Sequence, residues 1–272
     1  MKICICIRTV TLGTKRNTMA DVQSKLEQAL YDLTMEHLAK LAEYVPGQIK
    51  KKGTRDALLR AYQQDPVFSI FGLDSIEYLC ATLAGGTVTS IHRKIGDIYE
   101  ACIKTIFMHV FKQSADNVTY GAVIRSGDEQ ENRSADAYLQ FDRLDSASRK
   151  RVSTYCQTVV ATLTDNPQIK LVGVGLEVRH CYQTGDSKRT QADEAMARHL
   201  LLSGILPVMP LFCNQSNPDI VNRYKSVWIV KQGHEAYDLV KTFTGFDFYD
   251  FLQRNREDFR LPVIELLRSL TK

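Results

Sequence analysis

The segment that most constrains the fold is residues 170–182, KLVGVGLEVRHCY, whose first half is almost wholly apolar. Strands that are buried on both faces read as continuous apolar runs, and helices cover the sheets that contain them. A turn follows at TGDS, then a helical pattern over 188–202 and a second apolar strand over 205–212. A strand, a helix and a further strand in this order predict an α/β fold in which residues 170–182 form a central strand.

The remaining sequence predicts a hairpin, a further strand and several amphipathic helices. Strands are expected over 118–126 and 135–141, joined by a polar turn at 127–133, and over 227–230. Helices are expected near 21–44, 55–64, 74–83, 89–110, 146–163, 235–243, 247–253 and 262–270. We expect Gly85-Gly86 to break the helical pattern. The prediction is a helical region over 1–88, for dimer contacts or DNA clamping, and a domain over 89–272 with a mixed β-sheet flanked by helices.

Composition favours a folded protein of the reducing cytoplasm. The seven cysteines are scattered and odd in number, unlike the cysteines of a secreted disulfide scaffold. No run approaches the roughly 18 apolar residues of a membrane span, so we expect no membrane association. The net charge of +4 permits a polyanionic partner without requiring one.

Two carboxylates are placed to hold a metal ion. Asp136 is the first polar residue of the segment ADAYLQF, and Glu177 ends the apolar run VGVGLEV. A carboxylate in such a run is costly to bury unless it meets a cation. Mg²⁺ commonly binds to one or two carboxylates together with waters and phosphate oxygens, so carboxylates on two adjacent strands suit it.

These residues resemble the motif of the PD-(D/E)XK nuclease superfamily. The match comprises Asp136 in SADAYL, Glu177-Val178-Arg179 ending a buried strand, the preceding helix with Glu100, and the helix and strand over 184–214. The resemblance covers about residues 90–235 and implies a restriction-endonuclease-like core. It implies a type II restriction endonuclease that binds Mg²⁺ through Asp136, Glu177 and Glu100. Such an enzyme cleaves double-stranded DNA at a short, usually palindromic site as a homodimer.

The sequence departs from this motif in three places. Ala135 stands where the family has a proline, and 41 residues separate Asp136 from Glu177, more than is usual, so the helix at 146–163 is expected to be an insertion. Arg179 replaces the expected lysine, and an arginine is a poor proton acceptor because of its high pKa. Either Arg179 only stabilises charge while a metal-bound water supplies the nucleophile, or Lys188 reaches the site from the next helix.

The candidate DNA contacts are basic or amide side chains outside the carboxylate pair. Lys188 and Arg189 are the strongest, because they begin a helix whose backbone amides favour phosphate. Gln183 and Asn132 are candidates for contacts with base edges. The full set of DNA-binding candidates is Lys188, Arg189, Arg125, Arg143, Gln183, Arg93 and Lys94, with Asn132 as a further amide.

Each assignment has a simpler interpretation. Asp136 would then bond turn amides, Glu177 and Arg179 would form a surface ion pair, and Glu100 would be an exposed helix residue. His180 is expected to face the opposite side of the sheet from Arg179 as a packed histidine. The alternative functions are a DNA repair or junction nuclease of the same fold and a catalytically silent DNA-binding protein. A P-loop nucleotide binder is disfavoured because QTGDSKRT lacks the spacing GxxxxGK[ST].

Overall fold

The computed structural model describes residues 19–43, 53–70, 72–126, 129–161, 170–182 and 187–269. Its helices are α1 (Met19–Ala42), α3 (Arg55–Gln63), α4 (Pro66–Ile70), α5 (Ile76–Phe111), α6 (Ser146–Ala161), α7 (Ser187–Leu202), α8 (Pro218–Tyr224), α9 (His234–Thr244), α10 (Phe248–Arg254) and α11 (Arg256–Ser269). Its strands are β1 (Tyr120–Ser126), β2 (Glu129–Ala135), β3 (Ala137–Gln140), β4 (Gly173–Leu176), β5 (Ile205–Leu211) and β6 (Ile229–Gln232). Short 3-10 turns lie at Ala115–Val118 and Phe141–Arg143.

Four of the strands form a mixed sheet in the order β3-β4-β5-β6. β3 is antiparallel to β4, whereas β4, β5 and β6 are parallel. All residues of β4 and β5 are buried, as expected of strands covered on both faces. The predicted α/β class and the central position of the apolar strand are therefore confirmed, although regular pairing in β4 covers only the middle of residues 170–182.

The two faces of the sheet pack against different helices. On one face, Val174 and Leu176 of β4 contribute to a core that also contains Ile106 of α5 and Phe243 of α9. The other face packs against α7 and α8, and Gly175 permits the close approach of α7, since an added Cβ would lie 3.0 Å from a methyl carbon of Leu200. Side chains of even number in β4 thus face α5, and those of odd number face α7.

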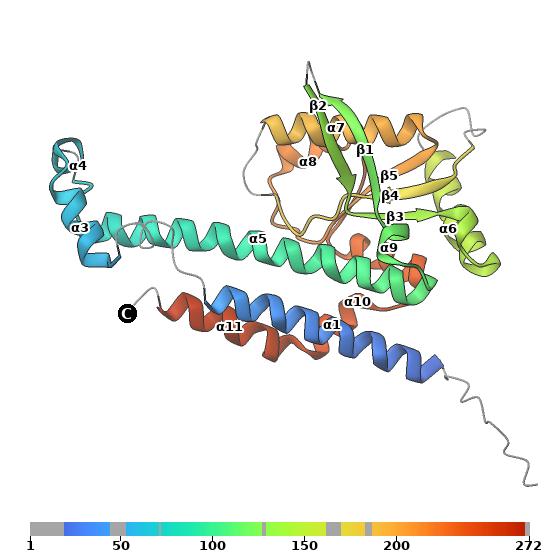
Figure 1. The fold of residues 1–272 in the computed structure, drawn as a ribbon, viewed down its shortest axis with the longest axis horizontal. Helices are drawn as coiled ribbons and strands as arrows, with labels where there is room; N and C mark the ends of the chain where they lie inside the picture. The colour runs from blue at the N-terminus through green and yellow to red at the C-terminus, as the bar shows by residue number, and fades with distance from the viewer. Residues whose placement is uncertain are drawn as a thin grey trace, which may run out of the picture.

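A long helix, α5, runs across the molecule and carries α3 and α4 at its N-terminal end (Figure 1). α1 packs against both α5 and α11, and its Leu30 belongs to the same core as the sheet. The predicted break at Gly85-Gly86 is wrong, because α5 continues through both glycines with Leu83 and Thr87 buried on either side. The predicted boundary at residue 88 falls within this helix.

The predicted hairpin has a different second strand. β1 pairs with β2, so most of the segment expected to be a turn is strand, and the connection shortens to residues 127–128. β2 has the polar sequence EQENRSA, which lacks the alternation of apolar and polar residues that predicts a strand, and among its side chains with described burial only that of Ala135 is buried. The chain then bends at Asp136 and enters β3, which pairs with β4 rather than with β1.

No helix in the described ranges is both long enough and apolar enough to cross a bilayer. Two short helices, α4 and α8, were not foreseen in the sequence, and α11 begins earlier than predicted. The pattern Asn217-Pro218 begins α8, where the Asn217 side chain accepts a hydrogen bond from the backbone N–H of Asp219.

Candidate metal-binding and catalytic site

The pairing of β3 with β4 brings Asp136 and Glu177 together. Tyr138 lies opposite Gly175, so the same register continued by two residues places Asp136 opposite Glu177. Both side chains lie on the face that α7 covers, with side-chain exposures of 15% and 8%. The Val178 backbone N–H donates to Asp136 Oδ2 at 2.8 Å, which fixes that carboxylate against the end of β4.

Arg179 lies between the two carboxylates. Its Nη1 donates to Asp136 Oδ2 at 3.1 Å, and its Nη2 donates to Glu177 Oε1. The Nε atom donates to the Tyr182 hydroxyl at 2.9 Å. Glu177 and Arg179 therefore point to the same face, as predicted, but they form a buried ion pair because only 13% of the Arg179 side chain is exposed.

A third carboxylate, Asp193 on α7, completes the cluster. Arg179 Nη2 lies 3.7 Å from Asp193 Oδ2, and the Tyr224 hydroxyl donates to the same oxygen at 2.8 Å. Asp193 is not among the residues that the sequence pattern predicted for the site. The sequence feature that could have identified it is the helical spacing of Asp193, Ala197 and Leu200, which places this carboxylate on the buried face of α7.

The cluster holds more negative than positive charge. Among the described residues, its ion pairs join one guanidinium to three carboxylates. Burial raises the pKa of Asp136 to about 6, against the opposing effect of Arg179. Burial alone would lower the pKa of Arg179, but Tyr182, Asp136 and Asp193 raise it above its usual value, so this side chain stays charged.

Glu100 lies at the margin of the cluster. It extends from α5 and forms an ion pair with Lys104 at 2.6 Å, with 39% of its side chain exposed. Its charge contributes to the raised pKa of Asp136, which places it within electrostatic reach of that carboxylate. A half-buried helix residue outside the metal site would form the same contact with Lys104, so the role of Glu100 as a third metal ligand stays a prediction.

The carboxylate pair fits a magnesium ion by the chemistry of its donors. Within the described ranges, no group of three or more His, Cys, Asp or Glu side chains is arranged to hold a metal ion. Mg²⁺ commonly draws only one or two carboxylates from a protein and completes its shell with water and phosphate oxygens. Asp136 and Glu177 supply that number, and the surplus of buried negative charge favours a cation beside them.

Among the side chains that the structure describes, the candidate DNA contacts do not form a cluster with Asp136 and Glu177. Arg93 is exposed on α5, Lys94 pairs with Asp97 at 3.1 Å, and Arg143 donates to Asn117 Oδ1 at 2.8 Å. The backbones of Lys188 and Arg189 lie in the first turn of α7 and that of Arg125 in β1, but the positions of these side chains are outside the description, as is the whole of Gln183.

His180 packs on the other face of the sheet, as predicted. Its Nε2 lies 2.9 Å from Nδ1 of His92 on α5, and the two rings are stacked with centroids 5.1 Å apart. Burial, together with the neighbouring His92, lowers the pKa of His180 to about 4. This pair links α5 to the segment that follows β4 and takes no part in the acid cluster.

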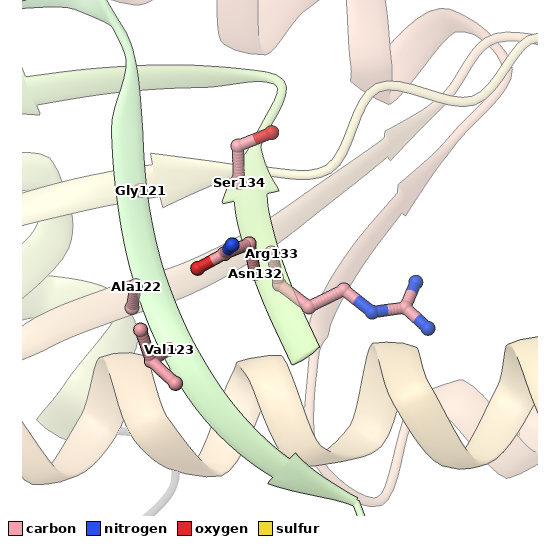
Figure 2. A pocket seen from close by; sticks show the side chains of 6 residues that line it. All are labelled: Gly121, Ala122, Val123, Asn132, Arg133 and Ser134. Carbon is pink, nitrogen blue, oxygen red and sulfur yellow. The ribbon is translucent and has the colours of Figure 1, made fainter. Parts of the chain in front are cut away.

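A shallow depression lies on the β1–β2 hairpin (Figure 2). It is lined by Gly121, Ala122, Val123, Asn132, Arg133 and Ser134, so Asn132 lies in it while Asp136 and Glu177 do not. The side chain of Arg133 extends away from that of Asn132 in Figure 2. The depression is therefore separate from the acid cluster.

Comparison of the chain with protein-family models, with curated proteins and with solved structures gave no significant match.

Proposed function

We propose that this chain is a magnesium-dependent nuclease that hydrolyses phosphodiester bonds of double-stranded DNA, with Asp136 and Glu177 as the metal ligands. The observation that carries the proposal is the buried cluster in which these two carboxylates meet across adjacent strands with a surplus of negative charge. Hydrolysis of a phosphodiester needs a cation to neutralise the charge that develops on the phosphate, and this cluster is suited to hold one.

The order of the elements supports the same proposal. A helix (α5) precedes the strand pair β1 and β2, and β3 then carries the chain into the sheet beside β4. α7 and β5 follow, with Asp136 before β3 and Glu177 after β4. This order agrees with the nuclease resemblance in the sequence. The type II restriction activity, the palindromic site and the homodimer are the finer part of the proposal and depend on that resemblance.

Each residue of the cluster has a defined task in this proposal. Mg²⁺, when bound, supplies positive charge to the attacked phosphate and lowers the pKa of water. Asp136 and Glu177 hold the ion, and Arg179 donates hydrogen bonds to a phosphate oxygen without accepting a proton. Lys188 is the alternative cation, because its backbone lies at the start of α7, where helix amides favour a phosphate.

Cleavage of plasmid DNA tests this proposal. The wild-type protein should convert supercoiled DNA to open or linear forms in Mg²⁺ but not in EDTA, and Asp136→Asn should reduce the rate by at least about a hundredfold, as expected for loss of a group that stabilises the transition state. Asp142→Asn is the matched control, since it makes the same chemical change at an exposed residue six positions along the chain. Equal cleavage by wild type and Asp136→Asn would refute the assignment.

A specific observation favours the second candidate, a catalytically silent DNA-binding protein. Arg179 donates to both Asp136 and Glu177 and thereby provides the positive charge that a metal ion would otherwise supply. In this case the protein should bind DNA without cutting it, with an affinity that falls steeply as salt concentration rises. Binding at two salt concentrations, measured beside cleavage in Mg²⁺, separates the two candidates. Binding that does not depend on salt would argue against DNA as the partner.

A further inference from the structure

One guanidinium nitrogen of Arg179 lies near two carboxylates on different segments of the chain. The same nitrogen, Nη2, donates to Glu177 Oε1 and lies 3.7 Å from Asp193 Oδ2. Its Nε atom is held by the Tyr182 hydroxyl at 2.9 Å. A small rotation of the guanidinium about this held end would therefore exchange one carboxylate for the other while the side chain stays in the cluster.

Asp193 is fixed in place independently of Asp136 and Glu177. Its Oδ2 atom accepts from the Tyr224 hydroxyl at 2.8 Å and from the Tyr182 hydroxyl at 3.4 Å. Its backbone carbonyl accepts from Trp228 Nε1 at 3.2 Å, which anchors this turn of α7. Only 8% of the side chain is exposed, so a nearby cation is the natural partner of its charge.

Arg179 and a metal ion compete for the same two carboxylates. A cation bound by Asp136 and Glu177 would stand beside a guanidinium that now contacts both of them, and like charges at such short range repel strongly in a buried site. Asp193 offers the guanidinium a third carboxylate within reach of its present position. A buried arginine that lost two acidic partners without this alternative would be left poorly paired.

We infer that Asp193 is a positioning residue that takes up Arg179 when Asp136 and Glu177 bind a divalent cation. The inference rests on the proposed metal site and adds to it an arrangement in which Arg179 moves from the metal ligands onto Asp193. The Tyr182 hydroxyl would hold Nε in both arrangements, so the guanidinium would stay within the cluster.

Binding of Mn²⁺, followed through the paramagnetic resonance signal of the free ion, tests the inference without any catalytic readout. Asp193→Asn should weaken Mn²⁺ binding about tenfold, within the usual range of coupling between interacting sites. Arg179→Gln should tighten it, because the competing cation is removed. In the Arg179→Gln background, Asp193→Asn should change the dissociation constant by less than about threefold, since its effect acts through Arg179.

Asp142→Asn is the matched control, because it makes the same chemical change at an exposed residue outside the cluster, and it should not weaken Mn²⁺ binding. Melting temperatures establish that each variant is folded. If Asp193→Asn does not fold, Asp193→Ser replaces it, because serine removes the charge and leaves a smaller polar side chain.

The outcomes separate this inference from the proposed function. If wild type binds Mn²⁺ and Asp136→Asn does not, the metal site stands, and an unchanged dissociation constant for Asp193→Asn overturns the inference alone. An effect of Asp193→Asn that is the same in both backgrounds also overturns it, because the carboxylate would then act through its charge and not through Arg179. If wild type and Asp136→Asn both fail to bind Mn²⁺, the proposed metal site and the inference fall together.

Discussion

Replacing Arg179 with methionine removes the only positive charge that the described ion pairs supply to three buried carboxylates. Methionine retains much of the side-chain volume, so the principal loss is electrostatic. Asp136 and Glu177 lose a direct partner and Asp193 loses a nearby one, while each keeps a side-chain exposure of 15% or less. Removing one partner of a buried ion pair typically costs about 3–5 kcal/mol of the free energy of unfolding. We expect a cost in this range at pH 8.

The cost should depend on pH in a direction that the cluster determines. Burial already raises the pKa of Asp136 to about 6 in the presence of Arg179, and the loss of this cation raises it further. The folded protein then binds more protons than the unfolded chain, so stability falls as pH rises through the raised pKa. At pH 5 Asp136 of the variant takes up a proton and no longer carries an unpaired charge, so the cost of Arg179→Met should be smaller than at pH 8.

Urea unfolding at pH 5 and pH 8, in EDTA so that no metal ion neutralises the cluster, measures this difference. Arg254→Met is the matched control, because Arg254 forms a bidentate pair with Glu27 but is 49% exposed, and exposed pairs contribute only about 0–1 kcal/mol. A cost for Arg179→Met below about 1 kcal/mol at pH 8, or the same cost at both pH values, would refute the reasoning.

Two further predictions concern the other face of the sheet and a backbone constraint. The folded-state pKa of His180 is lowered to about 4, so the unfolded chain binds the extra proton between about pH 6.5 and pH 4, and stability falls as pH drops through this window. His180→Gln should make the slope of unfolding free energy against pH shallower there, and equal slopes would contradict the assignment. Gly233→Ala should destabilise the protein by more than about 2 kcal/mol, because its φ of +60° with ψ of −127° is a conformation reserved for glycine and the new Cβ would also displace the Asn214 side chain, whose Oδ1 would lie 2.1 Å from it. Gly245→Ala should cost only about 1–2 kcal/mol in the same urea titration, because φ is +77° but no atom lies within 4 Å of the new Cβ. Equal costs at the two positions would show that the contact with Asn214 is unimportant.

The sequence by itself determined the elements in which apolar residues follow the pattern of a buried strand or an amphipathic helix throughout. The apolar run before Glu177 predicted a central strand, and the spacing of leucines in α1 predicted an amphipathic helix, because burial on one or both faces imposes a pattern on neighbouring residues. The same periodicity predicted that Glu177 and Arg179 share a face and that His180 lies on the other one. Local spacing was sufficient because a strand alternates its side chains.

Only the tertiary structure decided how these elements pair and which charges meet. Gly85-Gly86 signalled a break, but the burial of Leu83 and Thr87 on either side outweighs the roughly 1 kcal/mol that each glycine costs a helix. The strand β2 was missed because its polar sequence has no alternation of apolar and polar residues, although it pairs with the neighbouring strand β1. Asp193 joins Arg179 across 14 positions of the chain, and the register of β3 with β4 sets Asp136 opposite Glu177. The charge balance of the site therefore depends on contacts made in three dimensions, which residue spacing along the chain does not encode.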